Sequence, residues 1–138
     1  MTFANTIDTF CLAWTSVAAK RREKLIALSF DEAGLYVDPL VQIRGRAALI
    51  AHIEAVTARR GGVRLVRNGA IDHHHDHVRF CCQVIESDGC AAAEVPFYAE
   101  LGQGTDRLVK VVAFRGPPQA GPTRSVSRNQ WAPFIDVS

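Results

Sequence analysis

The sequence lacks any stretch of eighteen consecutive apolar residues, so it predicts no helix that could cross a membrane. The N-terminus lacks a basic segment followed by an apolar core, so we expect no signal peptide. Cysteine is scarce, with 4 residues and no CxxC pair, which disfavours a zinc knuckle. Cys81 and Cys82 are adjacent and would point to opposite faces of a strand, so no disulfide framework is expected. Reduced thiols in a cytoplasmic protein fit this usage best.

The net charge is also small, at +2, because the chain has 16 Lys and Arg residues and 14 Asp and Glu residues. Such a balance does not indicate nucleic-acid binding unless the basic residues form a concentrated patch. The nearest approach to a patch is six arginines: Arg44, Arg46, Arg59, Arg60, Arg64 and Arg67. They have no interleaved aromatic residues on which bases could stack, so we interpret them as a solvated face and expect no nucleic-acid partner.

The pattern of apolar residues predicts helices in the first part of the chain. At 138 residues the chain is long enough for one domain with its own core. Apolar residues recur with helical spacing over 3–18, with Thr2 or Asn5 as candidate N-cap, over 20–30, and over 46–60, which ends at Gly61–Gly62. A short strand, 35–38, lies between the second and third helices and stops at Pro39.

From Val63 onward, apolar and polar residues alternate, which predicts strands. The three long ones are expected over 71–86, 90–101 and 107–115, joined by glycine-containing turns as an antiparallel meander. Helices followed by a sheet predict an α+β fold with the helices packed on one sheet face. We assign residues 1–116 to this domain and 117–138 to a linker and tail, whose apolar end is suited to dock on the domain or on a partner subunit.

Asp38 is the first candidate for acid–base chemistry. It ends a predicted strand directly before Pro39, and Tyr36 lies two positions earlier on the same face. A carboxylate held against an apolar sheet loses water, which raises its pKa and suits a general base. The alternative is a turn aspartate exposed to water, the commonest fate of Asp before Pro. Trp14, on the first helix, could wall a cavity near it.

A second candidate is the histidine cluster at the head of the long predicted strand, His73, His74, His75, Asp76 and His77. If Val78 and the apolar residues after it face the core, alternation places His74 and Asp76 on that same face. A bulge at His75–Asp76 would reverse the assignment, so His75 stays a candidate.

Three interpretations of the histidine cluster stay open: an acid–base pair, a metal site and a solvated strand end. Two histidines two positions apart on a strand could share one ion, but His73 and His77 would lie about 13 Å apart. A metal would therefore need a third ligand that the sequence does not identify, and we predict no metal.

The order of these parts resembles the SnoaL-like branch of the nuclear transport factor 2-like superfamily, which includes ketosteroid isomerases and polyketide cyclases. The resemblance covers roughly residues 5 to 117. It is carried by segments 10–14, 36–39, 45–46, 69, 74–76, 78–80, 99–101 and 114–117. It implies a cone-shaped fold, in which a strongly curved sheet wraps the helices around a mostly apolar cavity, and a homodimer formed through the sheet.

The resemblance also bears on single residues. Asp38 stands where ketosteroid isomerases keep their general base, and Trp14 takes the place of the tyrosine in their oxyanion hole. The place of the second acid falls near Phe97–Tyr98, where no carboxylate is present. Steroid isomerisation through that oxyanion hole is therefore not expected.

We retain two hypotheses. The first is an isomerase or cyclase that acts on a small apolar carbonyl compound without a metal or organic cofactor. Its candidate catalytic residues are Asp38, His74, Asp76 and Tyr36, and its candidate ligand-binding residues are Trp14, His52, His75, Phe80 and Tyr98. The second is a binding or assembly module of the same fold that performs no chemistry.

Overall fold

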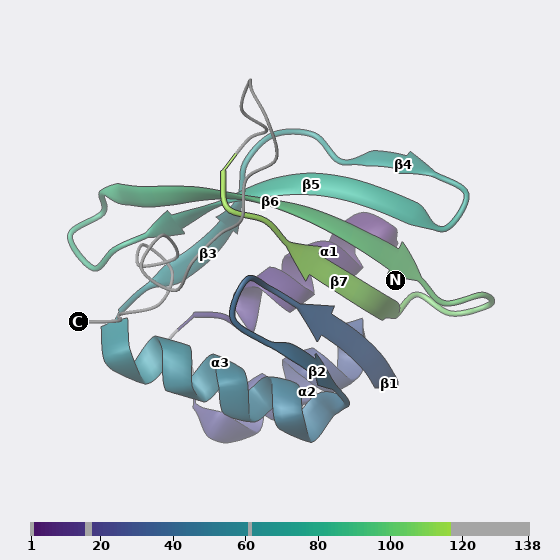
Figure 1. The fold of residues 1–138 in the computed structure, drawn as a ribbon, viewed down its shortest axis with the longest axis horizontal. Coiled ribbons are helices and arrows are strands. Elements are labelled where there is room, and N and C mark those ends of the chain that lie inside the picture. The colour runs from purple at the N-terminus through teal and green to yellow at the C-terminus, as the bar shows by residue number, and fades with distance from the viewer. Residues whose placement is uncertain (1, 16–17, 61, 117–138) are drawn as a thin grey trace.

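Helices pack on the inner face of a strongly curved sheet that does not close into a barrel (Figure 1). The structure is a computed structural model, and it describes residues 2–15, 18–60 and 62–116. Within these ranges there are three helices, α1 (Phe3–Leu12), α2 (Ala19–Ser29) and α3 (Arg46–Arg60). The same ranges contain seven strands: β1 (Phe30–Val37), β2 (Gln42–Arg44), β3 (Arg64–Arg67), β4 (Asp72–His74), β5 (His77–Ile85), β6 (Ala91–Leu101) and β7 (Leu108–Ala113). The predicted α+β class is confirmed.

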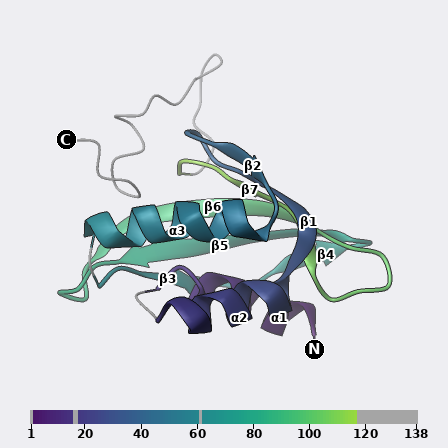
Figure 2. The same ribbon diagram turned by 90° about the horizontal axis from the view of Figure 1, so that it is seen from below.

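The strand order is β2-β1-β7-β6-β5-β3, and β4 pairs with β5 outside this path. β1 and β7 run parallel, whereas the other neighbours are antiparallel. The predicted meander is therefore present as β5, β6 and β7. Seen from below, α3 runs alongside the long strands while α1 and α2 lie together beneath them (Figure 2).

The helix predictions hold, with one shortening. The Oγ1 atom of Thr2 accepts a hydrogen bond from the amide of Asn5 at 3.2 Å, which makes Thr2 the N-cap of α1. α1 ends at Leu12 rather than at residue 18, and the bounds of α3 are those predicted. No helix among the described residues is long and apolar enough to cross a membrane.

Two strand predictions are wrong. The expected strand 71–86 is divided by a tight turn at His75–Asp76, and His74 pairs with His77 across the resulting hairpin. His75 has a φ of +52°, the left-handed conformation that lets two residues reverse the chain. The expected strand 35–38 begins earlier, at Phe30, and ends at Val37. Within it the Phe30 ring covers Gly34 so closely that a Cβ added there would lie 2.6 Å from the ring.

The core lies between the helices and the concave sheet face. On β5 the apolar set Val78, Phe80, Cys82 and Val84 points inward, as predicted, and is buried. Phe80 stacks on Phe97 of β6 with ring centroids 5.0 Å apart. The proposed linker and tail, 117–138, lie outside the described residues.

Candidate functional site

The turn between β1 and β2 holds Asp38 by its own backbone. The amide of Asp38 donates to the carbonyl of Val41 at 2.9 Å. In return the Oδ1 atom of Asp38 accepts from the amides of Leu40 at 2.8 Å and Val41 at 3.0 Å. Aspartate commonly closes turns in this way, and Pro39 fixes the backbone within this one. The carboxylate is therefore rigidly placed at the end of β1.

The second carboxylate oxygen joins Asp38 to two side chains. Its Oδ2 atom accepts from the hydroxyl of Tyr36 at 2.9 Å. It also lies 3.0 Å from the Nε2 atom of His52, which belongs to α3, the helix that packs against β1 and β2. Because an ionised carboxylate only accepts, Nε2 of His52 carries the hydrogen of this bond. Tyr36, Asp38 and His52, together with Trp14, form what we call the Asp38 cluster.

Aromatic rings enclose the polar atoms of the Asp38 cluster. The Trp14 ring lies 5.4 Å from the Tyr36 ring and 5.8 Å, edge to face, from the His52 ring, measured between centroids. Tyr36 and Trp14 are both buried. Arg22 holds the backbone on either side of Trp14, donating to the carbonyls of Ala13 at 3.0 Å and Thr15 at 2.8 Å. Trp14 is thus a fixed wall of the site.

The predicted rise in the pKa of Asp38 is wrong. Burial by itself raises the pKa of this carboxyl, but the hydrogen bond from His52 opposes it, and so do those from the Leu40 amide and the Tyr36 hydroxyl. The net result is a pKa below its ordinary value. For Tyr36, burial and the neighbouring charge of Asp38 raise the pKa well above its ordinary value, so the phenol keeps its proton.

Exposure separates the roles within the cluster. The Asp38 side chain is 0% exposed, whereas the His52 side chain is 12% exposed. Asp38 therefore cannot touch a ligand without losing a hydrogen bond, while the imidazole of His52 can be reached. Of the two, His52 is thus the side chain that keeps contact with solvent.

The histidine hairpin is not part of this arrangement. His74, His75 and Asp76 are all exposed at the tip of the β4–β5 hairpin. These polar residues therefore form a solvated turn, which is the third of the interpretations given above.

Sheet register shows how far this hairpin lies from the Asp38 cluster. His77, which directly follows the turn, is in register with Leu35 of β1 through β6 and β7. At about 4.8 Å per strand the two are roughly 14 Å apart along the sheet. A proton-transfer step shared by His74 and Asp38 is incompatible with this separation.

Two other predicted ligand-binding residues, Phe80 and Tyr98, have different surroundings. Phe80 is buried in the core, where it stacks on Phe97. Tyr98 lies on the opposite, outer sheet face from its buried neighbours Phe97 and Ala99. There its hydroxyl contacts Nδ1 of His77 and donates to Glu100 at 2.9 Å. Of the nine predicted site residues, the structure brings together Trp14, Tyr36, Asp38 and His52.

No three His, Cys, Asp or Glu side chains in the described part of the chain are grouped as metal ligands would be.

Two residues of the site were undervalued or missed in the sequence. His52 was predicted only as one of several ligand-binding residues. Its position beside the apolar stripe of α3 indicated that it could be partly buried. Its bond to Asp38 depends on how α3 packs against β1, which the sequence does not show. Arg22 was missed altogether, because a charged residue in a helix carries no sign of burial in the sequence.

Comparison with known proteins places the chain in a family. No protein-family model matches the sequence, and neither does any curated protein. Among solved structures, a protein from Agrobacterium tumefaciens, provisionally named an isomerase of the SnoaL-like family, has a TM-score of 0.77 and 30% identity. The match covers 83% of this chain and 97% of that protein.

Two more distant structures share the fold. A protein from Sinorhizobium meliloti, provisionally named a polyketide cyclase, has a TM-score of 0.62 and 10% identity, covering 79% of this chain and 93% of that one. A protein with a ketosteroid isomerase-like fold from Catenulispora acidiphila, solved with trimethylamine, has a TM-score of 0.59 and 17% identity, covering 82% and 85%. Together with the Agrobacterium structure, the order of elements shows that this chain belongs to the SnoaL-like family of the nuclear transport factor 2-like fold.

Proposed function

We propose that the protein is an acid–base isomerase or cyclase that acts on a small, largely apolar carbonyl compound and needs no cofactor. In this proposal Nδ1 of His52 removes or returns a proton next to the carbonyl, and Asp38 orients the ring. The observation that carries it is the 3.0 Å bond between Nε2 of His52 and Oδ2 of a fully buried Asp38. A histidine fixed by a carboxylate is a common general base, because its pKa range is matched to neutral pH.

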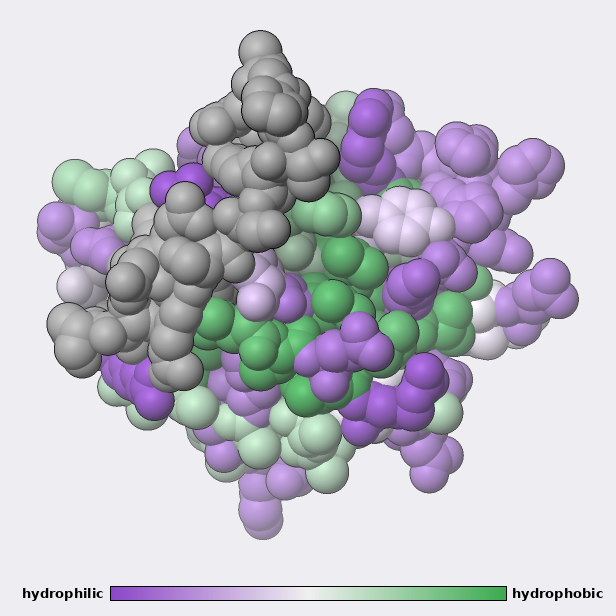
Figure 3. Space-filling view, viewed as in Figure 1, coloured by the Kyte–Doolittle hydropathy of each residue, from purple (hydrophilic) through white to green (hydrophobic). Residues whose placement is uncertain are grey.

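The surroundings of the cluster fit an apolar ligand. Figure 3 shows hydrophobic side chains gathered over β1, β2 and β7. Leu40, Val41, Ile43 and Ile50 are partly buried residues that pack against the core. Leu40 and Val41 belong to the turn that holds Asp38, and Ile43 is the strand partner of Tyr36. Apolar contact area therefore adjoins the polar atoms that would act on the ligand.

The family member from Agrobacterium, provisionally named an isomerase, supports the reaction class. The residues do not support the oxyanion hole of ketosteroid isomerases. Trp14 replaces its tyrosine, the Tyr36 hydroxyl already donates to Asp38, and Phe97 is a buried core residue. We therefore place the substrate outside the steroids, among smaller ketones and esters.

Deuterium exchange next to a carbonyl tests this proposal without knowledge of the natural substrate. A panel of small cyclic and aromatic ketones and β-ketoesters is incubated with the protein in D₂O, and loss of the α-proton signal is followed by NMR. We expect catalysed exchange for at least one compound class, and a fall of about 10²-fold or more in His52→Gln. His77→Gln, which changes an exposed histidine, is the matched control and should exchange like wild type.

The binding-module hypothesis gives a different result in the same experiment. Compounds would then raise the melting temperature, since binding to the native state stabilises it, while exchange stayed at the rate in buffer. Exchange that is equal in wild type and His52→Gln would also overturn the proposal. A homodimer through the outer sheet face is a separate proposal, which a measurement of mass in solution tests.

A further inference from the structure

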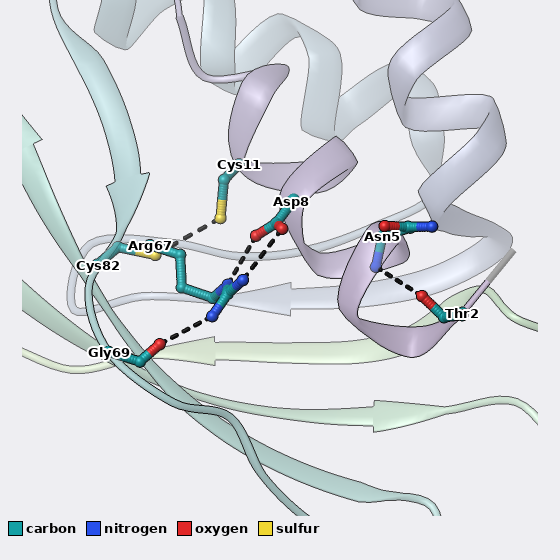
Figure 4. Close-up of polar contacts among 7 residues, drawn as sticks. All are labelled: Thr2, Asn5, Asp8, Cys11, Arg67, Gly69 and Cys82. Atoms are coloured by element: carbon teal, nitrogen blue, oxygen red, sulfur yellow. Dashed lines mark hydrogen bonds and ion pairs between the residues drawn. The ribbon is translucent and has the colours of Figure 1, made fainter.

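Two buried thiols face each other between α1 and β5. The Sγ atoms of Cys11 and Cys82 lie 3.5 Å apart, although the residues are 71 positions apart in sequence (Figure 4). Both are free cysteines, with 3% and 0% exposure respectively. The pair takes no part in the Asp38 cluster, so any chemistry of these thiols is independent of the proposed function.

A surface groove leads to one of the two cysteines. It has a volume of about 360 Å³ and lies between α1 and β3, lined by Asp8, Cys11, Leu12, Thr15 and residues 64–67. Cys11 is part of this lining, whereas Cys82 is not. A small solute that enters the groove therefore meets Cys11 first, with Cys82 bonded to it from the sheet.

A fixed positive charge lies beside the pair. Arg67 is the ladder partner of Cys82 on the neighbouring strand. Its guanidinium donates to both carboxylate oxygens of Asp8, at 2.7 and 3.1 Å, and to the carbonyl of Gly69 at 2.8 Å (Figure 4). These three bonds hold the guanidinium in place in the lining of the groove, where its charge is paired with that of Asp8.

Cys82 holds its proton firmly. The hydrogen bond with Cys11 and burial raise the pKa of Cys82 well above its ordinary value. Either sulfur can be the donor in the S–H···S contact, so the groove, and not this hydrogen bond, distinguishes the two cysteines. Cys11 lines the groove and Cys82 does not, so we assign Cys11 as the cysteine that a solute reaches first.

We propose that Cys11 and Cys82 form a reversible redox pair that is oxidised by peroxides entering the groove between α1 and β3. The Cys11 thiolate attacks one peroxide oxygen, an S–O bond forms as the O–O bond breaks, and the leaving hydroxide takes up a proton to become water. The Cys82 sulfur then attacks Cys11, forming the S–S bond and breaking the S–O bond. The second hydroxide leaves as water with the proton from Cys82.

The overall reaction balances: two thiols and one hydrogen peroxide give one disulfide and two water molecules. Each sulfur loses one electron and the peroxide gains two. The sulfurs need to approach from 3.5 Å to about 2.0 Å, which is within the reach of side-chain rotation and a small shift of α1. A dithiol reductant such as dithiothreitol reverses the change.

The test uses a protein in which the other two cysteines are replaced, Cys81→Ser and Cys90→Ser. Cys81 of β5 donates to Glu94 of β6, and burial and that carboxylate raise the pKa of the Cys81 thiol to about 12. Cys90 is exposed. Folded protein is treated with hydrogen peroxide, and intact mass and peptide mapping follow the product. We expect loss of two hydrogen atoms, a peptide link between Cys11 and Cys82, and full reversal by dithiothreitol.

The groove is tested by filling it. Leu12→Trp narrows it and should slow disulfide formation at least 5-fold in the folded protein, while the rate in urea is unchanged. Leu28→Trp, at an exposed position on α2 that does not line the groove, is the matched control and should react like the parent. Both variants leave the thiols intact, so the readout does not depend on tolerance of a core change.

Two results would overturn the proposal. One is a folded protein in which both thiols stay reduced, or in which Cys11 proceeds to sulfinic acid, at peroxide concentrations that oxidise the urea-unfolded chain. The other is an unchanged rate in Leu12→Trp, which would mean that oxidation requires unfolding rather than entry through the groove.

Discussion

The Nε2 atom of His52 lies 3.0 Å from the Oδ2 atom of Asp38, and the carboxylate beyond it is closed off from solvent. Among the described residues, this carboxylate accepts four hydrogen bonds, from Tyr36, His52 and the amides of Leu40 and Val41. The imidazole is therefore held in one orientation with its Nε2–H inward. In the proposed function Nδ1 is the nitrogen that keeps its lone pair and acts as the general base.

Asp38→Asn should abolish this orientation while it preserves the shape of the turn. The asparagine oxygen can still accept from Leu40 and Val41, but its amide donates toward Nε2 of His52. Nε2 must then be the bare nitrogen, and Nδ1 takes the hydrogen, so the base is lost. We expect α-proton exchange to fall by about 10²–10⁴-fold, measured by NMR at saturating ligand.

The control for Asp38→Asn is Asp31→Asn, which changes another aspartate of β1, one that bonds the amide of Ala33. It should leave the exchange rate within about twofold of wild type. A loss of exchange in both variants would assign the effect to β1 as a whole rather than to the bond with His52.

The acid stability of the protein should depend on Asp38. Its pKa is lower in the folded chain than in the unfolded chain, so the unfolded chain binds more protons as the pH falls. The stabilising contribution is therefore complete above about pH 4 and is lost as the pH falls through the lowered folded value. Urea unfolding between pH 3 and 7 should show a steeper loss for wild type than for Asp38→Asn. If the free energy of unfolding fell equally with pH in both proteins, the Asp38 carboxylate would make no stabilising contribution.

The fold was largely readable from the sequence because burial imposes periodicity. The bounds of α3 and the inward face of β5 follow directly from it. The histidine hairpin was not readable, because five polar residues give no alternation and the turn depends on a left-handed His75. The alternation of apolar and polar residues identifies single helices and strands, so it does not reveal a turn that lies within a run of polar residues.

The candidate site was only half readable. Asp38 and Tyr36 could be found because they share one strand face, and Trp14 because the family resemblance placed it nearby. The pKa of Asp38 was predicted in the wrong direction because the deciding groups come from elsewhere: the turn amides and His52. Desolvation can be guessed from sequence, whereas the hydrogen bonds that outweigh it depend on tertiary structure.

Tyr36→Phe should lower the free energy of unfolding and make it less sensitive to alkaline pH. The buried Oδ2 atom of Asp38 loses one of its two side-chain donors, which costs about 1–3 kcal/mol at neutral pH. The pKa of Tyr36 is raised by folding, so its contribution is complete below about pH 10 and is lost as the pH rises further.

The difference in the free energy of unfolding between wild type and Tyr36→Phe should therefore be smaller at pH 10.5 than at pH 7. Tyr98→Phe, on the outer sheet face, is the comparison and should cost less at pH 7. Equal costs for the two tyrosines would contradict a structural role for the Tyr36 hydroxyl.

Arg22 should be far more important for stability than its neighbour. Arg22→Met leaves the buried carbonyls of Ala13 and Thr15 without their donor, and we expect a loss of about 2–4 kcal/mol in urea unfolding. Arg21→Met changes an exposed side chain on the same helix and should cost less than about 0.5 kcal/mol. Similar losses for the two would mean that Arg22 does not anchor the segment that carries Trp14.

The role of His52 is tested most directly by the position of the hydrogen on its ring, observed by long-range ¹H–¹⁵N NMR at neutral pH. We predict hydrogen on Nε2 and a bare Nδ1 in wild type, and the reverse in Asp38→Asn. A ring that carries hydrogen on both nitrogens in wild type, or the same tautomer in both proteins, would contradict the assignment of His52 as a base oriented by Asp38.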